Sequence, residues 1–154
     1  MSELSPKTII KKYLVQAKIM QLATVRNGQP WICSLHFASD DDSNIYWITK
    51  PTTRHSQDIE ANAHVAIAIA VKTDRPLIGI QVEGTAEELT DAAVLGPAME
   101  RYIEHHGTDK AFVDTIVAGT NEHKLYAFHP RRFSLFDQVN FSDQPSQEWV
   151  IDSK

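Results

Sequence analysis

The chain has 154 residues, of which 42% are hydrophobic, and it carries 15 Lys and Arg against 20 Asp and Glu, a net charge of −5. This length and apolar content suit a single domain with a buried core, over residues 1–154, and exclude a disordered tail. The acidic balance argues against nucleic acid as a partner, because phosphate backbones are bound by Lys and Arg. The single cysteine, Cys33, excludes an internal disulfide and a cysteine-based metal cluster.

The same sequence predicts a soluble protein. Its N-terminal residues lack the basic start, apolar stretch and small-residue cleavage site of a signal peptide. The longest uncharged apolar run, residues 65–71, is too short to span a bilayer. We therefore expect a cytoplasmic protein with no membrane partner.

The first half of the chain predicts one helix followed by strands. Ser5 is a typical N-cap before a proline, and apolar residues then recur at helical spacing to about Ile19. Asn27 and Gly28 are typical of a tight hairpin turn. The expected strands are residues 20–26, 31–38, 45–49, 65–71 and 77–87, with a short helix at 54–62.

The second half begins with a helical pattern from Thr90, in which Gly96 and Pro97 predict a kink or a division into two helices. The further expected elements are a helix at residues 109–117 and strands at 124–128, 132–136 and 148–151, with Pro130 as a break. Short antiparallel strands with helices at one end and in the middle predict a mainly β fold. We expect a small barrel of six to seven strands with peripheral helices.

Few of the common chemical motifs are present. The sequence lacks the P-loop, the glycine-rich dinucleotide fingerprint and the paired-histidine zinc motif. His105 and His106 are adjacent and would point about 100° apart on a helix, so we expect solvated histidines at a helix end and no metal site. Cys33, in the middle of an expected strand, is interpreted as a small buried apolar group.

Residues 48–56 carry the most chemical information. A strand ends here, hydroxyl residues and cations cluster, and a short helix begins. Free backbone N–H groups at a helix start, the hydroxyls of Thr49 and Thr53, and the planar fork of Arg54 suit a phosphate monoester. The alternative is an ordinary polar loop with a helix cap.

This segment and its surroundings resemble the pyridoxamine 5′-phosphate oxidase-like, FMN-binding split-barrel superfamily, and in particular a small bacterial subgroup of it. The resemblance rests on Tyr-Trp-Ile-Thr at 46–49, Thr-Arg-His-Ser-Gln-Asp-Ile at 53–59 and Asn-Ala-His-Val-Ala-Ile-Ala-Ile at 62–69. Leu-Ala-Thr-Val at 22–25, Asn-Gly-Gln-Pro at 27–30 and Ile-Gln-Val-Glu-Gly-Thr-Ala at 80–86 extend it. It implies a split β-barrel that forms a homodimer, with two FMN sites between the subunits.

The resemblance also implies roles for particular residues. Arg54 matches an arginine at the FMN phosphate, and His55 stands where many members have a phosphate-binding lysine. Histidine carries full positive charge only below its pKa, near 6.5 when unperturbed, so phosphate binding here would depend on pH. Thr53 and Thr49 match positions that face the phosphate and the flavin edge, and Ile48 matches a strand residue that contacts the flavin.

Three further residues are assigned in the same way. Ser34 lies on the strand that runs beside the isoalloxazine in the family, and Gln81 lies on a strand face that supplies a polar contact to the flavin. Trp149 is placed to cover the flavin of the partner subunit, or else is an ordinary core or interface aromatic. Residues 129–132 lack the Arg-x-His spacing of true pyridoxamine-phosphate oxidases, so we do not expect vitamin B6 oxidation.

We therefore expect an FMN-dependent oxidoreductase, in which hydride passes between a small substrate or a nicotinamide donor and the flavin. One alternative keeps the fold but makes the protein a flavin or haem store, or a sensor, without turnover. A second alternative is a hydrolase or isomerase of a phosphorylated metabolite that uses His55 as a base.

Overall fold

The computed structural model describes residues 4–151. Its helices are α1 (Pro6–Gln16), α2 (Arg54–Ala61), α3 (Ala92–His106) and α4 (Lys110–Val117). Its strands are β1 (Ile19–Arg26), β2 (Gln29–His36), β3 (Ala38–Ser39), β4 (Ile45–Thr49), β5 (His64–Lys72), β6 (Ile78–Glu88), β7 (Lys124–Asp137) and β8 (Ser146–Val150).

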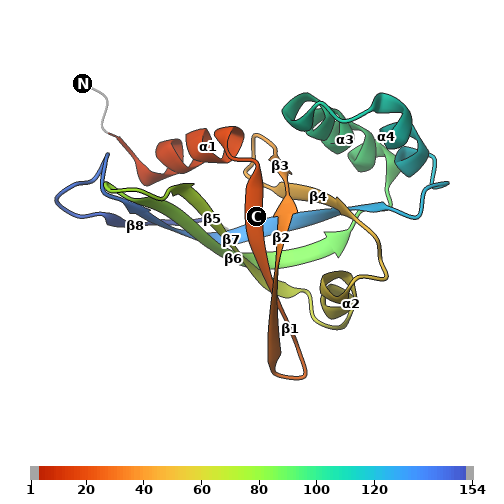
Figure 1. Ribbon diagram of the computed structural model, residues 1–154, viewed down its shortest axis with the longest axis horizontal. Helices are drawn as coiled ribbons and strands as arrows, with labels where there is room; N and C mark the ends of the chain where they lie inside the picture. Colours follow the sequence, from red (N-terminus) through yellow and green to blue (C-terminus); the bar gives the residue numbers. More distant parts are fainter. Residues whose placement is uncertain (1–3, 152–154) are drawn as a thin grey trace.

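The eight strands of this range form one antiparallel sheet (Figure 1), with the order β2-β1-β5-β6-β7-β4-β3 and with β8 paired to β7. β6 pairs with β7 along nearly all of its length, whereas β4 pairs only with residues 124–128 and β8 only with residues 132–136. The sheet therefore divides at residues 129–131, where β4 and β8 separate. This curled, divided sheet confirms the predicted mainly β fold with peripheral helices.

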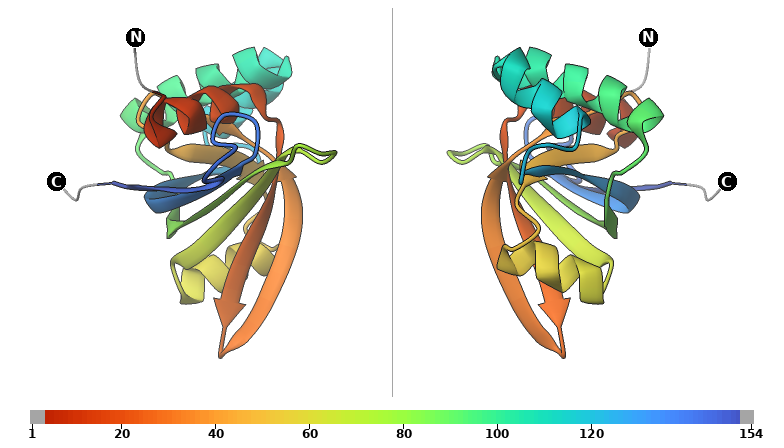
Figure 2. Two further views of the ribbon diagram at one scale, coloured as in Figure 1. Left: turned by 90° about the vertical axis from the view of Figure 1, so that its left-hand side faces the viewer. Right: turned by 90° about the vertical axis from the view of Figure 1, so that its right-hand side faces the viewer.

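The helices cover the sheet at two places (Figure 2). α1, α3 and α4 lie together on one side, and α2 lies at the opposite end against the β1–β2 hairpin. The hairpin turns at Asn27 and Gly28, which both have positive φ (52° and 77°), as the Asn-Gly pair predicts. Within residues 4–151, no helix combines the length and the apolar character that crossing a bilayer requires.

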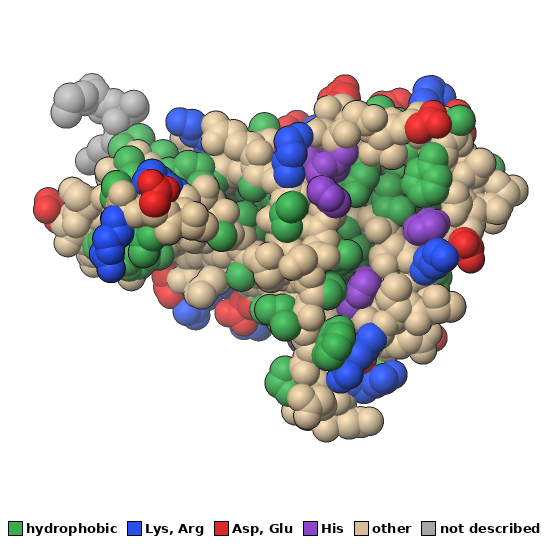
Figure 3. All heavy atoms as spheres, viewed as in Figure 1, with side chains coloured by type: hydrophobic (Ala, Val, Ile, Leu, Met, Phe, Trp, Pro, Cys, Tyr) green, Lys and Arg blue, Asp and Glu red, His purple; other side chains and the backbone are tan. Residues whose placement is uncertain are grey.

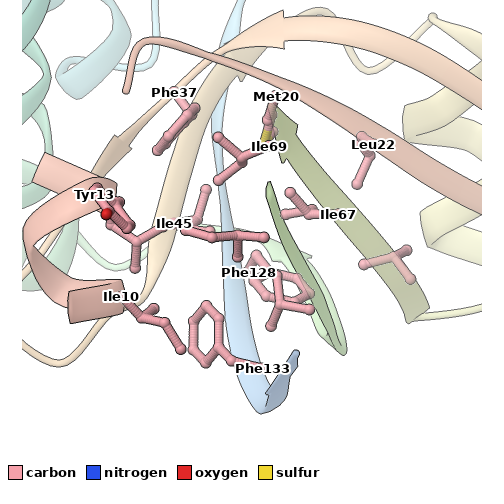
Figure 4. Close-up of a cluster of buried hydrophobic side chains, with 14 of the residues drawn as sticks. Ile10, Tyr13, Met20, Leu22, Phe37, Ile45, Ile67, Ile69, Phe128 and Phe133 are labelled. Carbon is pink, nitrogen blue, oxygen red and sulfur yellow. The ribbon is translucent and has the colours of Figure 1, made fainter. Parts of the chain in front are cut away.

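Two apolar clusters fill the interior. The larger one lies between α1 and the concave face of the sheet, where Tyr13, Met20, Phe128 and Phe133 point toward one another (Figure 4). The smaller one joins β4 and β7 to α3 and α4 through Tyr46, Leu95, Met99, Val113, Ile116 and Leu125. Because the alternating side chains of β4 enter both clusters, this strand is fixed from both faces.

β7 corrects one prediction, since it is a single strand where the sequence predicts two separated by Pro130. The register between β6 and β7 shifts at this point: Glu83 pairs with Arg132, but Gly84 pairs with Pro130. A proline is tolerated in a strand at such a bulge, because the ladder is already interrupted there. The missing N–H of Pro130 therefore does not end the strand.

α3 excludes the division into two helices at Pro97 and corrects one further prediction. It continues through Pro97 as one helix, because Leu95, Ala98 and Met99 pack into the smaller apolar cluster and hold both sides of the proline in place. Its last residues are not solvated histidines. His105 Nε2 lies 2.6 Å from the carbonyl oxygen of Ala17, and His106 Nε2 lies 2.6 Å from that of Phe37. A carbonyl only accepts, so both nitrogens carry a proton and fasten α3 to the chain around β1 and β2.

Candidate functional site

The candidate site begins where β4 ends and α2 starts, at residues 49–56, which we call the cradle. A turn at residues 51–53 follows β4, and Thr53 caps α2 by accepting a hydrogen bond from the backbone N–H of Ser56 at 3.3 Å. The Thr53 hydroxyl donates to the carbonyl of Lys50 at 3.0 Å, and so does the hydroxyl of Ser56 at 3.0 Å. The predicted helix start is confirmed, and its hydroxyl groups are gathered at one point.

His55 points into this cluster of hydroxyl groups. Its side chain is buried, and its Nε2 lies 2.8 Å from Thr49 Oγ1 and 3.1 Å from Thr53 Oγ1. Burial lowers the pKa of His55, and the nearby Asp58 carboxylate opposes this only in part. The ring is therefore neutral at neutral pH, and it contributes hydrogen bonding to the cradle without a positive charge.

Arg54 supplies a positive charge beside the cradle. Its guanidinium carbon lies 4.2 Å from the centre of the Trp31 ring, a stacked arrangement that holds the side chain against β2. Its Nε lies 3.9 Å from Asp58 Oδ2, one helical turn further along α2. Lys50 is the other cation of the segment. Its Nζ lies 3.1 Å from Glu122 Oε1, so its positive charge is partly neutralised.

A second arginine, which the sequence analysis does not single out, reaches the same carboxylate. Arg26 Nε lies 3.2 Å from Asp58 Oδ1, and the Thr24 hydroxyl donates to Oδ2 at 2.8 Å. Asp58 itself is fully buried. The spacing of Arg54 and Asp58 on a helix could have indicated their pairing, but Arg26 is distant in sequence and only the packing of α2 on β1 brings it in.

The surface around these residues is distinct in charge (Figure 3). Lys and Arg side chains gather over the end of the β1–β2 hairpin and the start of α2, and histidines follow from there toward α3. Apolar side chains lie between the histidines, and acidic groups are concentrated elsewhere on this face. This part of an acidic protein therefore presents a locally basic and partly apolar surface.

Ile48, Ser34 and Gln81 lie away from the cradle within one chain. Ile48 packs on the opposite face of β4, against the cluster formed with α3 and α4. Ser34 and Gln81 lie on the outer face of the sheet, in one row across β2, β1, β5 and β6. The row runs through Gln21 and Ala68, which pair with each other. The structure brings together Thr49, Thr53, Arg54 and His55, but a ligand in the cradle meets Ser34 or Gln81 of the same chain only by passing around the sheet edge.

Trp149 lies in β8, at the far side of the larger core. Its ring stacks on Phe133 with centroids 5.1 Å apart and planes at 9°, and the Lys7 ammonium lies 5.7 Å from its centre. The ring is half-buried and packs against the larger core. In a single chain it therefore acts as a core aromatic, and its expected contact with a partner's cofactor stays a prediction.

His36 joins His105 and His106 at the end of α3 in a cluster of rings, which the sequence does not predict. The rings of His36 and His106 have centroids 5.3 Å apart, and those of His105 and His106 are 4.7 Å apart. Tyr102 lies 4.6 Å from His106. Burial lowers the pKa of His106, and the nearby His105, His36 and Lys18 add to this.

Cys33 is half-buried in β2, and burial raises the pKa of its thiol, which disfavours a reactive thiolate.

A divided, curled antiparallel sheet with a hydroxyl-lined helix start at its open end defines the class of split β-barrel proteins. The sequence family described as pyridoxamine 5′-phosphate oxidase matches residues 7–134. The chain therefore belongs to the pyridoxamine 5′-phosphate oxidase family. No curated protein matches the chain in sequence.

Solved structures of the same fold come from several bacteria. The conserved hypothetical protein Rv2991 from Mycobacterium tuberculosis is 20% identical with a TM-score of 0.76, over 98% of this chain and 92% of that one. The haem-binding protein from Mycobacterium smegmatis is 13% identical with a TM-score of 0.74, over 96% of this chain but 60% of that one. HutZ, the haem storage protein from Vibrio cholerae, is 19% identical with a TM-score of 0.64, over 87% and 95%. At these identities the likeness concerns the fold alone.

Proposed function

We propose that the protein binds FMN and is a flavin-dependent oxidoreductase, with the flavin phosphate in the cradle. The observation that carries the proposal is the hydroxyl-lined start of α2, with Arg54 beside it, in a chain of this family. A phosphate monoester fits donors of this kind, because the first N–H groups of a helix, hydroxyls and a guanidinium all donate toward an anion. The exposed Trp31 ring adds a flat apolar surface of the kind that planar ligands contact.

The chain itself would bind and orient the cofactor. A bound FMN would supply the redox chemistry, by accepting hydride from a small substrate or a nicotinamide donor. Thr49 would direct its hydroxyl toward the phosphate end, and the neutral His55 would keep this hydroxyl in place through Nε2. The Thr53 hydroxyl, which already donates to the Lys50 carbonyl, would position His55 and the helix start. Because His55 is buried and its Nε2 is occupied by these hydroxyls, the arrangement does not favour the alternative in which it acts as a base toward a phosphorylated metabolite.

Titration with FMN tests binding, and anaerobic reduction tests turnover. We expect FMN fluorescence to be quenched on addition of the purified protein, and expect the visible flavin band to bleach with NADH or NADPH. Riboflavin, which lacks the phosphate, is the matched ligand and should bind more weakly. Equal affinities for FMN and riboflavin would show that the cradle does not bind the flavin phosphate. An absence of FMN binding would overturn the whole proposal.

Haem binding is a second candidate, which two observations favour. Two of the solved structures with this fold are a haem-binding protein and a haem storage protein. This chain also has an exposed histidine, His36, in ring contact with His106 at one end of β2. Addition of haemin distinguishes the two candidates. A shifted Soret band that is lost in the His36→Ala variant would support haem as the ligand and would give no support to FMN.

We also propose that two copies of the chain assemble through the outer face of the sheet. This face has a hollow of about 420 Å³, whose lining includes Ala66, Ala68 and the exposed Ile32 together with the charged Glu83 and Arg132. Ser34 and Gln81, which lie on this face, would then approach the cradle of the other copy. This arrangement would reconcile their expected flavin contacts with their distance from the cradle of their own chain.

A further inference from the structure

We infer that Arg26 and Arg54 form a paired anion site, held in position by the buried carboxylate of Asp58, and that this pair takes the phosphate group of the ligand. The inference rests on the proposed function, since it concerns the phosphate end of the same site. It adds Arg26 as a binding residue and Asp58 as a positioning residue. Neither follows from the sequence resemblance.

The geometry of the carboxylate is the first support. Arg26 Nε lies 3.2 Å from Oδ1 and Arg54 Nε lies 3.9 Å from Oδ2, as ion pairs without hydrogen-bond geometry, since Oδ1 has no hydrogen-bond partner among the described residues. Each guanidinium thus faces the carboxylate with its inner nitrogen. The terminal nitrogens of both form no hydrogen bond with any other residue of the range 4–151 that the structure describes. These outer nitrogens are the fork that binds carboxylates and phosphates in pairs.

The charge balance is the second support. Asp58 is fully buried and contributes one negative charge, whereas both arginine side chains are about 40% exposed. One carboxylate therefore holds two guanidiniums, and one positive charge is left over at the surface. An anion is therefore needed to balance this charge, and a phosphate monoester also has enough oxygens to accept hydrogen bonds from both guanidiniums at once.

Rigidity is the third support. Arg54 lies on the Trp31 ring, and the Thr24 hydroxyl fixes Asp58 at 2.8 Å, so neither the arginine nor its anchor moves freely. A guanidinium that is already ordered loses less conformational entropy when it binds an anion. The other charges near the cradle are weaker candidates, because His55 is neutral and Lys50 is paired with Glu122.

The test compares two ligands across matched variants of the full chain. Affinities for FMN and riboflavin are measured by calorimetry for wild type, Arg26→Ala and Asp58→Asn. We expect each variant to bind FMN about tenfold more weakly or worse, with riboflavin binding almost unchanged, because only the phosphate contact is lost. The ratio of the two affinities is the decisive readout, since a general loss of structure would weaken both ligands together.

Two control variants separate this role from a structural one. Asp137→Asn alters the other fully buried aspartate, which bonds to Tyr13 and Asn140 at the far side of the core. Arg101→Ala removes an arginine of α3 whose guanidinium is paired with the carboxylate of Asp41. We expect Asp137→Asn to lower stability, and expect both controls to retain the wild-type ratio of FMN to riboflavin affinity. An unchanged ratio in Arg26→Ala, or an equal change in the controls, would overturn the inference.

A titration with inorganic phosphate keeps the inference independent of the flavin. In ¹⁵N-labelled protein the Nε–Hε signals of Arg26 and Arg54 should shift together on addition of phosphate, and should fail to do so in Asp58→Asn. If wild type binds no FMN but these signals shift, the proposed function falls and the paired anion site stands. If neither FMN nor phosphate has an effect, both fall.

Discussion

The hydroxyl of Thr53 connects local helix formation to the candidate site. It caps α2, donates to the Lys50 carbonyl and lies 3.1 Å from His55 Nε2, so one side chain orders both the helix start and the buried ring. The sequence predicts this cluster of Thr49, Thr53, Arg54 and His55, because all four are close along the chain. It does not predict the contribution of Arg26, which reaches the cluster only through the packing of β1 on α2.

Replacing Thr53 tests this connection. We expect Thr53→Ala to lower the free energy of unfolding by about 1 kcal/mol or more, because α2 loses its cap. Thr53→Ser keeps the hydroxyl and should retain most of the stability. Urea denaturation followed by circular dichroism measures both variants, and equal stability of alanine and serine at this position would show that the hydroxyl has no such role.

Two histidines make the stability of the protein depend on pH. Burial lowers the pKa of both His55 and His106 in the folded protein, whereas the unfolded chain has the ordinary value near 6.5. Below about pH 6.5 the unfolded state therefore binds more protons than the folded state does. As the pH is lowered from this value, the free energy of unfolding decreases until the folded rings are also protonated. Above that pH these two groups contribute no further change.

The measurement is urea unfolding on both sides of this value, at about pH 7.5 and about pH 5.5. Wild type should be less stable at the lower pH. His106→Gln, which retains a side-chain donor for the Phe37 carbonyl, should show a smaller fall, since it removes one of the two titrating rings. A fall as large as in wild type would mean that His106 does not contribute.

At the scale of elements, the sequence predicts most strands and helices but misplaces their interruptions. Asn27–Gly28, the N-cap Ser5 and the strand at 45–49 are local signals, and the structure confirms them. Pro97 and Pro130 are also local signals, but neither ends its element. Packing into a core or position at a bulge outweighs the lost hydrogen bond, and a single sequence does not show where either will occur.

The bulge between β6 and β7 gives a sharp prediction at Gly84. A Cβ atom at this position would lie within 2.8 Å of Phe128 Cζ and even closer to the carbonyl oxygen of His129. Because backbone atoms cannot move aside cheaply, we expect Gly84→Ala to destabilise the protein by about 3 kcal/mol or to prevent folding. Gly79→Ala is the matched control in the same strand, since its Cβ would meet only one atom, at 4.0 Å.

Thermal unfolding compares these two glycine variants. Gly79→Ala should melt close to wild type, because alanine also restricts the unfolded chain. Gly84→Ala should melt far below it. Similar melting of the two variants would show that β6 and β7 can separate at the bulge without cost, and would weaken the account of how β7 continues through Pro130.

At the scale of the whole molecule, the sheet has one unprotected side. β2 is an edge strand, and Ile32, which shares the outer face with Ser34, is 61% exposed, whereas Trp31 points to the other face, where Arg54 lies on its ring. An exposed apolar side chain on an edge strand, next to a hollow with alanines in its lining, is typical of a surface that another chain covers. A second copy of this chain is the proposed occupant, because it would also bring Ser34 and Gln81 toward a cradle.

Sedimentation tests this arrangement. We expect wild type to sediment as a dimer of the 17.3 kDa chain, and Ile32→Glu as a monomer, because a charge on the covered face would lose its hydration on assembly. Val94→Glu is the control, since Val94 is also exposed, at 46%, but lies on α3 away from this face. A monomeric wild type, or equal dissociation of both variants, would contradict the proposed interface. If Ile32→Glu is a monomer that also loses FMN binding while its helices and strands are intact, the flavin site requires both copies.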